Sequence, residues 1–193
     1  MKSGQNKRAV RTKKRLTECL MTLMHTRSLQ DVTVSELTKL AGVNRGTFYL
    51  YYHDLPDMLA KIESEMFAAF EQIIRAHREE TVLHQTLPFL QELFAFAAEN
   101  RSMVSVLLGR NGDMSFLRRL DEVVYDKCLT DCRSLFPDEA SDTFPFRYNF
   151  AVFGCIGTVR AWVDGGCVQN SDDMARLVDS MIRSGVVRTS SGA

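Results

Sequence analysis

The chain has 193 residues with no formal net charge, and 45% hydrophobic, 25% charged and 9% aromatic residues, a balance that excludes a disordered or fibrous protein. Glycine and proline are scarce, and Leu, Ala, Met, Glu, Lys and Arg recur at helical spacing, so we predict an all-α fold. No apolar run approaches the roughly 20 residues of a membrane span, and the polar N-terminus is unlike a signal peptide. We therefore expect a cytoplasmic protein without a membrane partner.

The absence of net charge conceals an uneven distribution. Residues 1–53 contain ten Lys/Arg against three Asp/Glu, a net charge of +7, and residues 54–193 have a net charge of −7. This split favours two domains, 1–53 and 54–193, of which the first binds a polyanion. A solvated basic face explains the charge alone equally well.

The first predicted helix covers about residues 7–25, where apolar residues recur on one face behind a basic start. A second helix is predicted over residues 34–40. Thr33 can cap it, and Glu36, three residues later, can bond back to the Thr33 amide. These signals predict a capping box at the start of the second helix.

A third helix is predicted directly after the second. Gly42 can end the second helix in a left-handed conformation, and Asn44 can cap a helix from Arg45 to about Tyr51. Two helices joined by a tight glycine turn are typical of a helix-turn-helix. This motif binds DNA through the first turn of its second helix.

The residues that open the third helix suit base recognition. Arg45 can donate two hydrogen bonds to guanine O6 and N7, and Thr47 can reach a phosphate or a thymine methyl group. Gly46 permits close approach of the backbone, while Asn44 can contact a phosphate as well as the helix amides. One turn later, the Tyr49 phenol can donate to a phosphate.

A longer stretch resembles the DNA-binding signature of the tetracycline-repressor (TetR) family of bacterial transcriptional regulators. It reads Thr33-Val-Ser-Glu-Leu-Thr-Lys-Leu-Ala-Gly-Val-Asn-Arg-Gly-Thr-Phe-Tyr-Leu-Tyr-Tyr, within about fifty similar residues. The resemblance implies an N-terminal helix-turn-helix domain followed by a helical ligand-binding and dimerisation domain, about nine helices in all. It places DNA contacts at Thr33, Asn44, Arg45, Gly46, Thr47, Tyr49 and Tyr51. An aromatic core position is the alternative, more so for Tyr51 than for Tyr49.

The chain departs from the family at the start of the fourth helix. There the family usually has a lysine that holds a phosphate, whereas this chain has Leu55 and no lysine before Lys61. We therefore expect the protein to bind one phosphate fewer. Each phosphate left unbound flattens the log-log dependence of affinity on salt by roughly 0.9.

Beyond residue 53 we predict six more helices, over about residues 54–78, 86–100, 101–108, 114–136, 145–163 and 172–187. Eleven of the twelve phenylalanines lie in this part of the chain. With other large residues, they could line an apolar pocket for a small-molecule effector, as the resemblance implies. The pocket candidates are Phe67, Phe70, Phe94, Met103, Phe116, Tyr125, Phe150 and Trp162; a filled core is the alternative.

The predicted helix at 145–163 is apolar around most of its circumference, so more than one of its sides must be covered. With the helix at 172–187, it is the candidate dimer interface, through Phe153, Gly154, Gly157, Met174, Leu177 and Met181. A buried helix within one chain is the alternative. A two-fold homodimer would present two recognition helices roughly 34–36 Å apart and read a palindromic DNA operator.

The chain shows no motif for catalysis, a metal or a cofactor. Its five cysteines are odd in number and widely spread, and the pair Cys128 and Cys132 has no second pair at zinc spacing. We therefore predict a DNA-binding repressor and not an enzyme. The main alternative is a TetR-like interaction protein that acts through a protein partner and binds DNA weakly; an all-α enzyme has no acid/base pair to support it.

Overall fold

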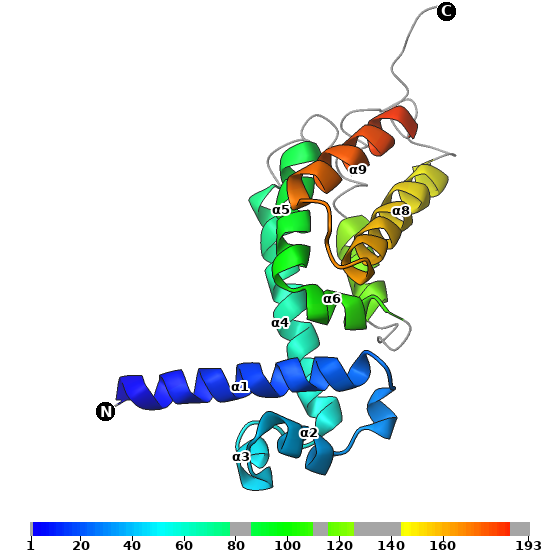
Figure 1. Ribbon diagram of the computed structural model, residues 1–193. Helices are drawn as coiled ribbons and strands as arrows, with labels where there is room; N and C mark the ends of the chain where they lie inside the picture. Colours follow the sequence, from blue (N-terminus) through cyan, green and yellow to red (C-terminus); the bar gives the residue numbers. More distant parts are fainter. Residues whose placement is uncertain (1, 78–85, 110–115, 126–143, 186–193) are drawn as a thin grey trace, which may run out of the picture.

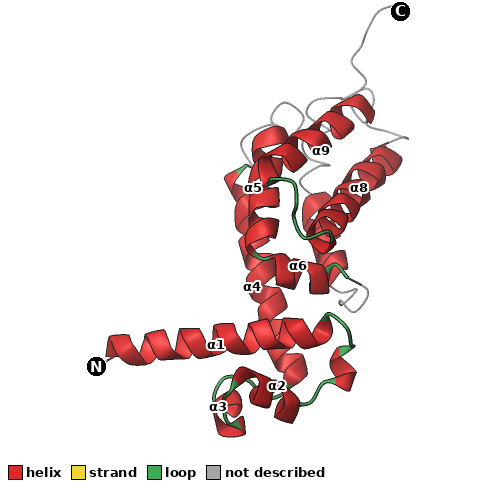
Figure 2. Ribbon diagram, viewed as in Figure 1, coloured by secondary structure: helices red, strands yellow, loops and turns green. Residues whose placement is uncertain are grey.

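In the computed structural model, the described residues are 2–77, 86–109, 116–125 and 144–185. Every regular element within these ranges is a helix, as Figure 2 shows, so the predicted all-α class is confirmed. None of the helices in this part of the chain combines the length and the apolar character that a membrane crossing requires.

The described helices agree with the predicted ones to within a few residues. The main differences are an earlier start of the first helix and an earlier end of the third. Only residues 116–125 of the helix predicted at 114–136 are described, and they are helical. The helices are α1 (Lys2–Met24), η1 (Leu29–Asp31), α2 (Val34–Ala41), α3 (Arg45–Tyr49), α4 (Leu55–Ala76), α5 (Thr86–Glu99), α6 (Arg101–Leu107), α8 (Phe144–Asp164) and α9 (Ser171–Gly185).

Helix α4 connects the two ends of the molecule. Its 22 residues correspond to a rod of about 33 Å. At one end lie α1, α2 and α3, and along the rest lie α5, α6, α8 and α9 (Figure 1). The helix-turn-helix therefore occupies one end of an elongated molecule, with α1 crossing α4 above it.

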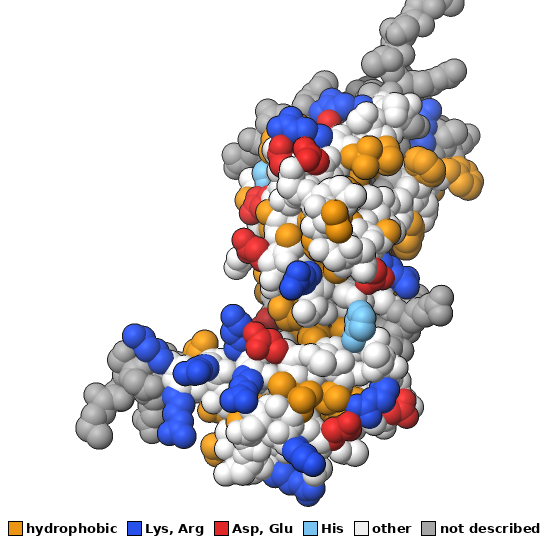
Figure 3. Space-filling model, in the orientation of Figure 1, with side chains coloured by type: hydrophobic (Ala, Val, Ile, Leu, Met, Phe, Trp, Pro, Cys, Tyr) orange, Lys and Arg blue, Asp and Glu red, His pale blue; other side chains and the backbone are white. Residues whose placement is uncertain are grey.

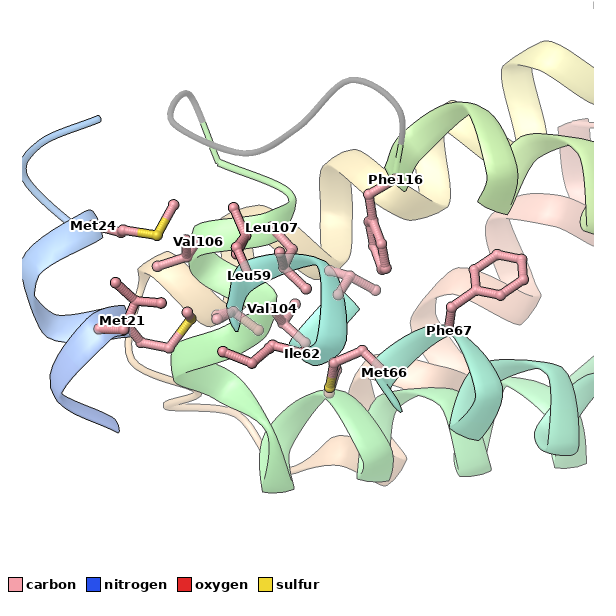
Figure 4. Packing of buried hydrophobic residues seen from close by; sticks show 14 of the residues in the cluster. Met21, Met24, Leu59, Ile62, Met66, Phe67, Val104, Val106, Leu107 and Phe116 are labelled. Atoms are coloured by element: carbon pink, nitrogen blue, oxygen red, sulfur yellow. The ribbon is translucent and has the colours of Figure 1, made fainter. Parts of the chain in front are cut away.

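The two ends are joined by a hydrophobic contact between α1, α4 and α6. Figure 4 shows Met21 and Met24 of α1 beside Val106 of α6, next to Leu59 and Ile62 of α4. All five side chains are buried in one cluster that extends into α8 and α9. Because this cluster is continuous across residue 53, the division into domains at that point stays a prediction.

Helices α5 and α9 pack along each other and are also joined by polar side chains. The Thr86 hydroxyl donates to the Asp179 carboxylate, and the Gln91 amide donates to the Asp172 carboxylate. Gln91 and Arg176 together hold the pKa of Asp172 below its ordinary value. These hydrogen bonds connect residues that are far apart in the sequence.

Candidate nucleic-acid interface

The start of α2 is fixed by one half of the predicted capping box. The Thr33 hydroxyl accepts a hydrogen bond of 3.2 Å from the Glu36 amide. The predicted return bond is wrong, because the Glu36 carboxylate pairs with Arg27 at 2.6 Å instead. Arg27 thus ties α2 to the segment after α1, an interaction that local capping rules do not include.

The turn between α2 and α3 depends on Gly42. Its φ of 62° and ψ of 37° are left-handed, a region that glycine adopts without strain. The Gly42 amide donates to the Lys39 carbonyl and the Val43 amide to the Thr38 carbonyl, which satisfies the end of α2. Arg15 of α1 lies directly over this glycine.

The turn delivers the chain to Asn44, which caps α3 as predicted. Its Oδ1 accepts 2.7 Å and 2.9 Å hydrogen bonds from the amide and the hydroxyl of Thr47. Arg45 and Gly46, in the first turn of α3, are exposed. The structure therefore brings Asn44, Arg45, Gly46 and Thr47 together at an accessible helix start, which is where a recognition helix meets base edges.

The tyrosines that follow have different surroundings. Tyr49 is 57% exposed, while Tyr51 is half-buried and has the Lys13 ammonium 5.5 Å from its ring centre. Phe48 and Tyr52 are buried and hold α3 against the core. Of the two tyrosines predicted to contact DNA, Tyr49 is thus the more accessible.

The junction between α3 and α4 explains the unusual residue at position 55. Leu55 is only 6% exposed and packs in the hydrophobic core at the first position of α4. Asp54 caps the helix by accepting from the Asp57 amide at 2.7 Å. Asp57 in turn accepts a 2.9 Å hydrogen bond from the His53 amide. Position 55 therefore contributes to packing in this chain.

The first lysine after position 55, Lys61, reaches this junction. Lys61 donates to the Tyr51 carbonyl at 3.1 Å and to Asp57 at 2.8 Å, and its ammonium lies 5.4 Å from the Tyr52 ring centre. The hydrogen bonds from Lys61 and the His53 amide lower the pKa of Asp57. Lys61 thus ties the end of the recognition segment to α4. Its spacing from Asp57, one helical turn, was the only signal for this interaction in the sequence.

The surface near these residues is positively charged. Figure 3 shows Lys and Arg side chains along α1 and near α3. Toward the opposite end of the molecule, Asp and Glu side chains are interspersed with them. The positive end is suited to a polyanion such as the DNA backbone.

The predicted pocket residues occupy three kinds of position. Met103 and Tyr125 are half-buried, and the Phe94 and Trp162 rings meet edge to face with their centres 5.4 Å apart. Phe150 is 69% exposed, so its placement in an interior pocket is wrong. Burial is also what a filled core requires, so the ligand pocket stays a prediction. The buried candidates are Phe67, Phe70, Phe94, Phe116 and Trp162.

The exposed phenylalanines belong to one side of α8. Phe146, Phe150 and Phe153 are 77%, 69% and 51% exposed and follow each other at helical spacing. Gly154 and Gly157 lie on the same side, and a methyl group on either would meet no atom within 4 Å. We call these five residues the α8 aromatic face; Figure 3 shows hydrophobic side chains gathered over α8.

The predicted interface residues of α9 divide between the surface and the core. Leu177 and Met181, one turn apart, are about half exposed. Met174 is 8% exposed and belongs to the core, so its assignment to the outer surface is wrong. Cys128 and Cys132 lie outside the described residues. Within the described residues, no cluster of three or more His, Cys, Asp or Glu could hold a metal.

Comparison with known proteins agrees with this geometry. A TetR family model described as "Transcriptional regulator C-terminal region" matches residues 84–184, which is just over half of the chain. The uncharacterized HTH-type transcriptional regulator YxbF of Bacillus subtilis (strain 168) is 31% identical over 103 residues, 48% of this chain. The matched stretch spans only 25% of the length of that curated relative.

Two solved structures have the same fold over almost their whole length. The fatty acid degradation regulator FadR from Bacillus halodurans has a TM-score of 0.68 and 18% identity, covering 92% of this chain and 97% of that one. FadR from Bacillus subtilis, in complex with stearoyl-CoA, has a TM-score of 0.67 and 17% identity, covering 90% and 98%. These two structures show the fold, and the family model that matches over half of the chain shows that the chain belongs to the TetR family of transcriptional regulators.

Proposed function

We propose that this chain represses transcription by binding a palindromic double-stranded DNA operator as a homodimer, and that a small apolar ligand among its C-terminal helices controls binding. The observation that supports DNA binding most directly is the opening of α3. There Asn44 fixes the first turn and leaves Arg45 exposed beside the equally exposed Gly46. These groups are suited to reading base edges in the major groove.

The remaining polar groups suit the phosphate backbone. Thr33 at the start of α2 and Tyr49 on α3 are both exposed and present hydroxyl groups. Hydroxyl groups at these positions can position the recognition helix on DNA without reading sequence. In this proposal Arg45 supplies base preference, and Thr33 and Tyr49 supply affinity.

A second copy of the chain is the proposed occupant of the α8 aromatic face. Exposed aromatic rings on one helix are unusual for a monomer and are typical of an interface. Leu177 and Met181 of α9 would add apolar area beside it. For the dimer to read a palindromic operator, this two-fold pairing must present both helix-turn-helix segments to one face of the DNA, roughly 34–36 Å apart.

The proposed effector is apolar because the interior of the C-terminal helices is aromatic and aliphatic. Phe94 and Trp162 touch at present, so a ligand would have to separate them or enter beside them. The acyl-CoA in the structure of B. subtilis FadR makes long-chain acyl-CoA the first compound class to screen. A ligand that binds one arrangement of these helices more tightly than another can change DNA affinity by no more than the difference between its two binding free energies.

The deciding experiment is selection of bound sequences from a random DNA pool, with the mass of the free protein measured in parallel. We expect an enriched palindrome and a dimer. A dimer without any enriched sequence would contradict the proposal and favour an interaction protein that acts through a protein partner. The buried Leu55, where the family usually has a phosphate-binding lysine, is the observation behind that second candidate.

The selected operator allows a first prediction about individual residues. Arg45→Ala should weaken the operator by about 1–3 kcal/mol and relax the preference at one base pair. Tyr49→Phe, the matched control, removes one hydroxyl and should weaken operator and scrambled duplexes alike. Fluorescence anisotropy with both duplexes measures this. Equal losses on both duplexes for Arg45→Ala would remove Arg45 from base reading.

A further inference from the structure

The first half of α1 protrudes from the rest of the molecule. Leu16 is the first residue of α1 that belongs to the hydrophobic cluster. The fourteen residues before it, from Lys2, form about 21 Å of helix, which extends past α4 in Figure 1. We call residues 2–15 the α1 arm.

All charged residues of the α1 arm are lysines or arginines. Residues 1–17 contain seven Lys/Arg and no Asp or Glu. At 100° per residue, most of these cations fall within about 120° of the helix circumference, opposite the side on which Leu16 and Leu20 are buried. The cations that share this exposed side are Lys7, Arg8, Arg11, Lys14 and Arg15.

These charges are not neutralised by the protein. In the described part of the chain, the ion pair of the arm joins Lys14 to Glu18 at 4.0 Å, with the two side chains 76% and 62% exposed. Such a long, exposed ion pair contributes little to stability. A helix whose exposed side is uniformly positive is suited to an anionic partner.

The base of the arm lies beside the recognition segment. The Lys13 ammonium is 5.5 Å from the Tyr51 ring centre, and the Arg15 guanidinium lies 3.0 Å from the point where a Cβ on Gly42 would stand. The arm therefore begins next to α3 and to the turn that positions it. DNA bound to α3 has its phosphates within reach of the cations that follow toward the N-terminus.

We infer that the α1 arm is a second DNA-binding element, which binds the phosphate backbone beside the groove that α3 reads. This inference rests on the proposed function. Duplex DNA has one negative charge for each roughly 1.7 Å of its axis, so an arm of about 21 Å faces enough phosphates for all its cations. Because phosphates contain no sequence information, the arm raises affinity for every duplex alike.

The test removes three charges from the exposed side of the arm, in the full chain. The variant is Lys7→Gln/Arg8→Gln/Arg11→Gln, in which glutamine keeps the helix propensity. The matched control, Arg101→Gln/Arg118→Gln/Arg176→Gln, removes the same charge from exposed positions outside α1 and the helix-turn-helix. Circular dichroism checks that all proteins keep the same helix content.

Affinity for the selected operator and for a scrambled duplex is then measured across a salt series. The arm variant should have a log-log salt slope flatter by roughly 0.9 for each phosphate that the arm no longer binds, and affinity should fall by the same factor on both duplexes. The control should keep the wild-type slope. An arm variant with the wild-type slope, or one that binds only the operator more weakly, overturns the inference.

Hydroxyl-radical footprinting gives an independent readout. The arm variant should lose protection at backbone positions outside those that Arg45→Ala affects, and unchanged protection contradicts the inference. Failure of the proposed function is distinguishable: wild-type protein would then enrich no sequence. Salt-dependent binding to any duplex, reduced in the arm variant, would still support the arm as a phosphate-binding element.

Discussion

The two ends of the molecule are stabilised by hydrogen bonds of very different range. Around α2, α3 and the start of α4, the bonds that cap the helices and close the junction join residues at most ten positions apart: Thr33 with Glu36, Asn44 with Thr47, Asp54 with Asp57, and Lys61 with the Tyr51 carbonyl. Among the C-terminal helices, three bonds between helices join residues that are 59 to 93 positions apart: Ser105 with Asp164, Gln91 with Asp172, and Thr86 with Asp179.

This difference separates the two proposed activities. The turns of the proposed DNA-reading surface are set by helix caps and a glycine, which are interactions between residues close together in the sequence. The ligand-responsive part depends on interactions between remote helices, which a ligand or a second copy can alter. The two parts are joined by α4 and by the hydrophobic packing of α1, α4 and α6 in Figure 4.

The largest effect should come from removing long-range packing. Phe94 of α5 is fully buried against Trp162 of α8, and Phe94→Ala should lower the free energy of unfolding by about 3–5 kcal/mol through the cavity it leaves. Val168→Ala, at an 82% exposed position, should stay within about 0.5 kcal/mol. Urea denaturation measures both. In Phe94→Ala, the backbone amides of α5 and α9 should exchange their hydrogens before those of α2. The reverse order would contradict the difference between the two ends of the molecule.

A smaller loss should follow from breaking the local turn. Gly42→Ala forces a Cβ into the left-handed region and toward the Arg15 guanidinium, at a cost of roughly 1–2 kcal/mol. Gly42→Asn, which tolerates this φ better, should lose less. Thermal unfolding ranks the two variants. If alanine and asparagine are equally well tolerated, the backbone of the turn is not the constraint.

The smallest effect is on the stability of the fold at low pH, through one aspartate at each end of the molecule. The pKa of Asp57 is lowered by Lys61 and that of Asp172 by Gln91, so both carboxylates stabilise the fold above the ordinary value of 3.8. That stability is lost as the pH falls below 3.8 through the lowered pKa. Asp57→Asn and Asp172→Asn should therefore each reduce the drop in urea midpoint on acidification. Glu99→Gln, at an exposed position, is the control; a drop unchanged in both aspartate variants would contradict the assignment.

The range of the interactions also explains which parts of the structure were predictable. The caps at Thr33 and Asn44 and the left-handed Gly42 depend on neighbouring residues, and all three are confirmed. The return bond from Glu36 was wrong because Arg27, nine residues earlier, competes for the carboxylate. Local patterns do not rank such competing partners.

Errors in the C-terminal half concern which side of a helix is covered. Helix α8 is apolar around its circumference, so its sequence does not distinguish the buried side from the exposed one. The prediction of an interior position for Phe150 is wrong for this reason. For Met174 of α9, the sequence does not show that α5 and α8 cover its side of the helix. Leu55 shows the same limit, because its burial depends on how α4 meets the other helices.

The order of the elements along the chain also matters while the protein is being made. The ribosome completes α3 and then needs roughly 5 to 20 seconds to reach the start of α8 at 5–20 residues per second. By then α5 and α6, against which the inner side of α8 packs, have already been synthesised. The apolar outer side of α8 is thus synthesised only after the helices that cover its inner side.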